Sequence, residues 1–203
     1  MNAPKPAEGR KGAFYLRNRT NLLTATQRVL ATKGQEAKLE DFAVEADMAV
    51  STIYKHFPNR EKLVEAAVVE AMLEWERDIF TATDSLTDPL QRLITPMQSF
   101  LNMKTTHPLF AEIIARNQEL TFKLAPVTTG NLATHILNLV KSGDLDIDFP
   151  EIRTRNLVAC LFAALQDQLN NPKAKLSDNL KSLTIALEML GISNKRASDL
   201  LNL

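Results

Sequence analysis

Residues 19–63 read RTNLLTATQRVLATKGQEAKLEDFAVEADMAVSTIYKHFPNREKL, and this stretch predicts three short helices. From Leu22 to Leu30, apolar or small residues recur every three or four positions, which is the spacing of one helix face. Gly34 then suits the left-handed residue that ends such a helix. Two further helices are predicted over 39–46 and 50–57, with only three residues between them. That arrangement is typical of a helix-turn-helix.

The third of these helices has two distinct faces. Ile53 and Phe57 are four residues apart, so we expect them to face the core. The other side chains include hydroxyls, an ammonium and an imidazole, which can meet phosphates or base edges in a major groove. They are Val50, Ser51, Thr52, Tyr54, Lys55 and His56, with Thr52 and His56 on the flank. Periodicity alone is equally consistent with a three-helix subdomain that binds nothing.

The same stretch resembles the DNA-binding region of tetracycline-repressor-type (TetR family) regulators. The resemblance rests on TIYKHF at 52–57, on NRE at 59–61 followed by Leu63, and on the spacing back to Gly34. The motifs cover about 45 residues. The rest of the chain resembles the family only in being all-helical and of the right length. The resemblance implies a homodimer with two recognition helices, a helical C-terminal domain with a small-molecule pocket, and repression that a ligand relieves.

The resemblance also implies roles for individual residues. Val50, Ser51 and Tyr54 would approach base edges, whereas Thr52, Lys55 and His56 would mainly hold the DNA backbone. Lys38 and Arg60 stand at helix N-termini, near where family members touch phosphate. These eight residues are the expected DNA-binding set.

The chain departs from the family pattern at three positions. Lys38 replaces the usual Thr cap, Asp47 the usual Gly, and Ala49 the usual capping Ser. Asp tolerates a left-handed conformation better than most residues other than Gly. The missing hydroxyl at Ala49 costs about 1 kcal/mol. These departures bear on docking and affinity and leave the fold unchanged.

Charge is divided unevenly along the 203 residues. The whole chain has 24 Lys and Arg against 24 Asp and Glu, but residues 1–62 contain eleven of the bases and seven of the acids, a net charge of +4. A basic segment on a neutral protein favours a polyanionic partner such as DNA. Chance asymmetry on a solvated surface explains the charge equally well.

Several classes of protein are not supported by the sequence. The single cysteine, Cys160, excludes an internal disulfide, and His56, His107 and His135 form no metal-binding pattern. No Gly-rich nucleotide loop, secretion signal or apolar run of about 20 residues is present. We therefore expect a cytoplasmic protein that is not an enzyme, uses no metal or cofactor and does not contact a membrane.

An all-α protein in three parts is predicted. Residues 1–15 are expected to be a flexible basic arm, residues 16–62 the helix-turn-helix domain, and residues 63–203 a helical domain for effector binding and dimerisation. Asn59 is expected to cap a fourth helix that runs to Phe80. Pro96 and Pro126 should kink or break helices. Further helices are predicted over 89–104, 108–116, 127–141, 150–170 and 177–191.

The C-terminal part contains a candidate dimer interface. The segment Leu157 to Leu165 is apolar on every side, so we expect it to be buried on all faces. Together with the helix from Leu180 to Leu190 it could form a four-helix interface across a two-fold axis. The alternative is a central helix buried within a monomer.

Aromatic and methionine side chains in the same part could line a ligand cavity, because flat rings and flexible thioethers suit an apolar molecule. The candidates are Trp75, Met97, Phe100, Met103, Phe110 and Phe122. Such residues are more often plain core.

Taken together, the sequence predicts a dimeric repressor that binds a pseudo-palindromic operator in double-stranded DNA. A small, largely apolar effector of unknown identity would release it, with the fourth helix as the lever. One alternative is an architectural or nucleoid-associated DNA-binding protein on the same fold that responds to no effector. Another is a helical protein-interaction module or an enzyme.

Overall fold

The computed structural model describes residues 9–124, 126–171 and 173–201, and in these ranges the regular secondary structure is helical throughout. The predicted all-α class is confirmed. The elements are α1 (Arg10–Lys33), the 3-10 helix η1 (Gly34–Glu36), α2 (Leu39–Glu45), α3 (Val50–His56), α4 (Arg60–Thr83), α5 (Pro89–Leu101), α6 (Met103–Thr106), α7 (Pro108–Arg116), α8 (Gln118–Leu124), α9 (Pro126–Ser142), α10 (Pro150–Asn170), α11 (Leu176–Met189) and α12 (Asn194–Leu201).

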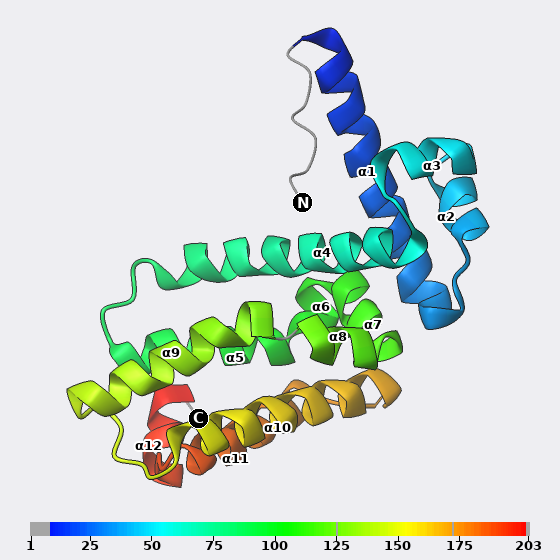
Figure 1. Ribbon diagram of the computed structural model, residues 1–203. Coiled ribbons are helices and arrows are strands. Elements are labelled where there is room, and N and C mark those ends of the chain that lie inside the picture. Colours follow the sequence, from blue (N-terminus) through cyan, green and yellow to red (C-terminus); the bar gives the residue numbers. More distant parts are fainter. Residues whose placement is uncertain (1–8, 125, 172, 202–203) are drawn as a thin grey trace.

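The helix-turn-helix forms as predicted. Helices α2 and α3 stand beside α1 (Figure 1), around a core that contains Leu22, Leu30, Phe42 and Ile53. Each of these four side chains is at most 1% exposed, which is the burial that the apolar spacing indicates. The apolar cluster to which they belong continues into α4, α6, α7 and α10, so the three N-terminal helices share their core with the rest of the molecule.

Helix α1 begins earlier than expected. Its first residue is Arg10, so residues 10–15 are helical and do not belong to a flexible arm. The rest of the expected arm, residues 1–8, lies outside the described residues. The ring of Tyr15 lies against that of His56 in α3, with centroids 4.3 Å apart. This tertiary contact supports the extra turns, and a helical periodicity search does not detect it.

The start of α4 forms as predicted, because the Asn59 side-chain oxygen accepts a hydrogen bond from the Lys62 amide at 2.9 Å.

The two prolines that were expected to kink or break helices differ from each other. Helix α5 continues through Pro96 without a break. At Pro126 the expected break is confirmed, because α8 ends at Leu124 and α9 begins at Pro126, where the missing N–H costs nothing. The single helix expected over 89–104 instead ends at Leu101, and a new helix, α6, begins at Met103.

Helix α4 connects the two halves of the molecule. Figure 1 shows it running between the α1–α3 domain and the layer formed by α5 and α9, with α10 and α11 on the far side. The predicted helices over 108–116, 127–141, 150–170 and 177–191 match α7, α9, α10 and α11 to within two residues. Helices α8 and α12 were not predicted. No helix of the described ranges is both long and apolar enough to cross a membrane.

Candidate nucleic-acid interface and effector cavity

Helix α3 presents polar side chains to solvent. Ile53 and Phe57 are 1% and 5% exposed, so both face the core as predicted. Ser51, Tyr54 and Lys55 are exposed on the opposite side, and Tyr54 keeps 56% of its surface open. A surface with a hydroxyl, a phenol and an ammonium has the chemistry to donate to base edges and phosphates.

Two other residues of the expected DNA-binding set are less exposed. Val50 is half-buried and packs against the core of the N-terminal domain, and Thr52 is also half-buried. Their side chains lie at the edge of the exposed face. Any contact they make with DNA would therefore use only part of each side chain.

His56 is held in place by α1. Its ring lies half-buried against Tyr15, and its Nδ1 atom is buried without a hydrogen-bond partner. Burial lowers the pKa of this imidazole, and the nearby positive charges of Arg19 and Lys55 lower it further. The neutral ring is thus favoured in the free protein, and only part of it is open on the flank of α3.

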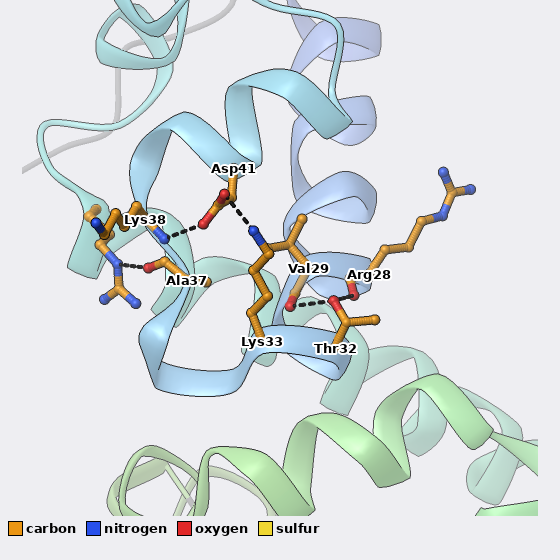
Figure 2. A network of polar contacts seen from close by, with 8 residues as sticks. Arg28, Val29, Thr32, Lys33, Ala37, Lys38 and Asp41 are labelled. Carbon is orange, nitrogen blue, oxygen red and sulfur yellow. Dashed lines mark hydrogen bonds and ion pairs between the residues drawn. The ribbon is translucent and has the colours of Figure 1, made fainter.

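The start of α2 is capped from inside the helix. In place of a hydroxyl cap, the Asp41 carboxylate accepts the backbone N–H of Lys38 at 2.8 Å and the Lys33 ammonium at 2.7 Å (Figure 2). The hydrogen bond from Lys33 is the main reason why the pKa of Asp41 is lowered. The Lys38 residue is exposed. Its ammonium can therefore meet a phosphate while Asp41 stabilises the helix start.

Arg60 has a structural role that sequence reasoning missed. Its Nε donates to the Ala37 carbonyl at 2.7 Å and its Nη2 to the Gln35 carbonyl at 2.9 Å. These two bonds tie the start of α4 to the segment before α2. Because a guanidinium has five N–H donors, others stay available for a phosphate.

The turn between α2 and α3 accommodates its unusual residues. Asp47 adopts a left-handed backbone with φ of 51°, which confirms that aspartate is tolerated where the family uses glycine. Ala49 precedes α3 in an extended conformation and gives no side-chain cap. The amides of the first turn of α3 are therefore not capped by that side chain.

A cavity of about 800 Å³ is lined by residues of the seven helices from α4 to α10. Trp75 closes part of the wall, where its indole N–H donates to the Ser99 hydroxyl at 3.2 Å and its ring meets Phe100 edge-on at 6.1 Å. Five of the six predicted lining residues do line it, namely Trp75, Met97, Phe100, Met103 and Phe110. The side chain of the sixth, Phe122, is outside the described part of the structure.

The mainly apolar cavity wall contains a few polar groups. Burial raises the pKa of Glu76, so the cavity stabilises the protonated carboxyl. Burial lowers the pKa of His135, although a backbone hydrogen bond with Pro89 acts in the opposite direction. The cavity therefore favours uncharged forms of both groups. Sequence periodicity did not single out either residue for this site.

Helix α7 connects this cavity to α1. Phe110 and Ile114 line the cavity, while the end of the same helix meets α1. The Asn117 side chain there donates to the Leu30 carbonyl at 3.5 Å, and a Cβ on Gly34 would come within 3.0 Å of the Arg116 Cβ and carbonyl oxygen. Helix α4 is therefore not the only connection between the cavity and the helix-turn-helix.

The candidate dimer helix α10 has one open face. Leu157, Leu161 and Leu165 are buried, but Ala159 and Ala163 are exposed. In the single chain the segment is thus not buried on all faces, which contradicts the alternative of a central helix enclosed within a monomer. On α11, Ile185 is 56% exposed. Small side chains on α10 and an open isoleucine on α11 permit close packing of another helix pair.

Among the residues that the structure describes, no three His, Cys, Asp or Glu side chains gather in a group that could hold a metal ion.

Comparison with known proteins identifies the N-terminal domain. Residues 22–67 match the family described as bacterial regulatory proteins, tetR family. No curated protein sequence matches the chain.

Solved structures share the fold over nearly the whole chain. RolR in complex with its ligand resorcinol has a TM-score of 0.73 at 17% identity, covering 93% of this chain and 94% of RolR. The fatty acid degradation regulator FadR from Bacillus halodurans has a TM-score of 0.70 at 18% identity, covering 85% and 94%. A putative tetR family transcription regulator from Shewanella sp. PV-4 has a TM-score of 0.70 at 19% sequence identity, and the match covers 84% of this chain and 96% of that protein.

Proposed function

Because residues 22–67 belong to the tetR family of bacterial regulatory proteins, we propose that this chain is a DNA-binding transcriptional regulator. It acts as a dimeric repressor on a pseudo-palindromic operator and leaves the DNA when a small, largely apolar effector binds. Residues 16–62 bind DNA, and residues 63–203 bind the effector and form the dimer. The exposed polar face of α3 is the observation that carries this proposal.

The DNA-binding residues divide by chemistry. Ser51 and Tyr54 approach base edges from the exposed face of α3, and Val50 approaches them from the edge of that face. The remaining members of the set hold phosphates through hydroxyl, ammonium, imidazole and guanidinium groups. They are Lys38, Thr52, Lys55, His56 and Arg60.

A two-fold dimer supplies the second recognition helix. The open Ala159, Ala163 and Ile185 surface of α10 and α11 supports a four-helix contact between two copies. Dimerisation places two α3 helices to meet half-sites one DNA turn apart, about 34 Å.

The cavity supports control by a small molecule. Its volume of about 800 Å³ is within the range of ligand sites, and its wall is mainly aromatic and aliphatic. Trp75, Met97, Phe100, Met103 and Phe110 would contact the effector. RolR, which shares this fold, was solved with resorcinol, a small aromatic ligand. An effector-independent architectural protein would need no such cavity, so the cavity favours the regulated repressor.

Two helices would transmit the signal. Helices α4 and α7 both line the cavity and both pack on α1. An effector that binds the DNA-incompetent arrangement more tightly than the competent one shifts the equilibrium, and a coupling of about 1 to 3 kcal/mol suffices. Hydrogen exchange with a verified effector should change protection in α4 and α7; unchanged exchange in both helices would contradict this route.

Binding to duplex DNA tests the proposal. Genome-wide immunoprecipitation of bound DNA supplies an operator, and fluorescence anisotropy then measures affinity for operator and random duplexes from 50 to 200 mM salt. Because a dimer carries the change twice, Lys55→Ala should weaken binding to both duplexes and reduce the salt slope by about 1.8, whereas Ser51→Ala and Tyr54→Phe should change the preference between them. Lys195→Ala, at an exposed position of α12, is the control with an equal charge change. Absence of any salt-dependent binding would refute the proposal.

A further inference from the structure

The N-terminal turns of α1 form a basic surface outside the matched family region. Residues 10–21 contain four Lys and Arg and no Asp or Glu. Figure 1 shows these turns projecting beyond α3 at the same end of the molecule. A helix with this composition has no acidic residue of its own to neutralise its charge.

One face of this helix is aligned with α3. Lys11, Tyr15 and Arg19 follow one another at intervals of four residues, so they share a face of α1. Tyr15 lies against His56 at 4.3 Å between ring centroids, and the Arg19 guanidinium lies 4.4 Å from the centre of the Phe57 ring. The shared face is therefore directed toward the C-terminal end of α3.

Lys11 extends this face beyond α3. A rise of about 1.5 Å per residue places its Cα about 6 Å past that of Tyr15 along the helix. The residue is exposed, and no carboxylate of the described residues forms an ion pair with it. Its ammonium is therefore available to an external anion.

Positive charges of α1 and α3 lie near each other at the C-terminal end of α3. The Arg19 guanidinium lies 4.4 Å from the centre of the Phe57 ring, and Lys55 is two positions before Phe57 in the chain. Lys11 extends this group of charges along α1. Phosphates spaced along a DNA strand are the anion that suits such a row of cations next to a recognition helix.

We propose that Lys11 and Arg19 bind backbone phosphates of the duplex that α3 enters, beside the C-terminal end of α3. The N-terminal turns of α1 are then a second DNA contact, which adds affinity without sequence preference. This inference rests on the proposed DNA-binding function.

The matched test uses two residues of the same helix segment. Arg17 is two residues from Tyr15, and about 100° per residue turns it to the opposite face, where its guanidinium stacks on the Phe14 ring at 5.5 Å. Lys11→Gln and Arg17→Gln each remove one exposed positive charge. Anisotropy titrations of the full chain with an operator duplex at 50, 100 and 200 mM salt compare them, with circular dichroism melts to verify folding.

A dimer loses two phosphate contacts, one from each copy, so Lys11→Gln should weaken binding and reduce the salt slope by about 1.8. The affinity advantage of the natural protein should therefore shrink roughly twelvefold between 50 and 200 mM salt. Arg17→Gln should leave the slope unchanged, and Lys11→Arg should restore it. Equal losses of DNA affinity for Lys11→Gln and Arg17→Gln would show that both residues act only by long-range electrostatic attraction. That result would refute the phosphate contact at Lys11. An unchanged DNA affinity for Lys11→Gln would also refute this contact.

Lys55→Ala in the same titrations separates the two proposals. If Lys55→Ala reduces the slope and Lys11→Gln does not, DNA binding by α3 stands and the α1 contact is refuted. If the natural protein shows no salt-dependent binding, both proposals fail together.

Discussion

Replacement of Gly34 by alanine tests how tightly the helix-turn-helix is fixed to the C-terminal helices. Gly34 has φ of 59° and ψ of −137°, a backbone region where other residues cost about 1 to 3 kcal/mol. An added Cβ would also lie 3.0 Å from the Arg116 Cβ and from its carbonyl oxygen. Both atoms belong to the rigid part of α7, so relief requires α1 and α7 to move apart. Overpacking of this kind costs about 1 to 3 kcal/mol more.

Gly143→Ala is the matched control, because Gly143 also has a positive φ, of 83°, but open space where its Cβ would be. Both variants should destabilise the fold, and Gly34→Ala should do so by the additional overpacking term. At about 3 °C per kcal/mol for a chain of this size, its melting temperature should lie roughly 3 to 9 °C below that of Gly143→Ala at equal protein concentration. Equal melting temperatures would show that the close approach of α1 and α7 is not a tight contact.

Three further predictions concern the dimer, the cavity and His56. Ile185→Glu should convert the dimer to a monomer in light scattering, since it places a charge on the open α11 surface; an unchanged mass would exclude that surface. Leu132→Trp should fill the cavity and abolish the fluorescence gain of an anilinonaphthalene sulfonate dye, whereas persistent dye binding would place the dye site elsewhere. Because burial and nearby cations lower the folded pKa of His56 below 6.5, folded stability should be retained above pH 6.5 and fall as the pH drops through that lowered pKa. His56→Gln should reduce this fall in denaturant titrations, and an unaltered pH profile would contradict it.

The helix-turn-helix was predictable because local spacing and local chemistry agree in it. Ile53 and Phe57 are one helical turn apart and both are buried, and Asn59 caps α4 through its own side chain. The positive φ of Asp47 likewise follows from what an aspartate tolerates. Each of these features depends on residues within one or two turns of the chain.

The same reasoning failed where the contacts are distant in sequence. The expected arm at residues 10–15 is helical because Tyr15 contacts His56, 41 positions further along. Arg60 donates to backbone carbonyls of residues 35 and 37, which no pattern near Arg60 reveals. Pro96 lies within α5, where packing against α4, α10 and α11 outweighs the missing hydrogen bond.

For the cavity, the sequence contained the residue types that line an apolar ligand site. It could not show whether these side chains line a cavity or pack together in the hydrophobic core. Met97 and Met103 are almost fully buried and also line the cavity. Whether such side chains contact one another or enclose a space depends on how the seven helices from α4 to α10 pack together. Glu76 and His135 enter the wall through that crossing alone.

The helical class, the three N-terminal helices and the residues offered on α3 follow from the amino-acid sequence, because hydrophobic spacing, caps and turn residues act over a few positions. Three features are evident in the folded molecule alone: α1 extends along the edge of α3, α7 joins the cavity to α1, and one face of α10 is open. Those features arise from contacts between residues far apart in the chain, whose energy local spacing does not encode.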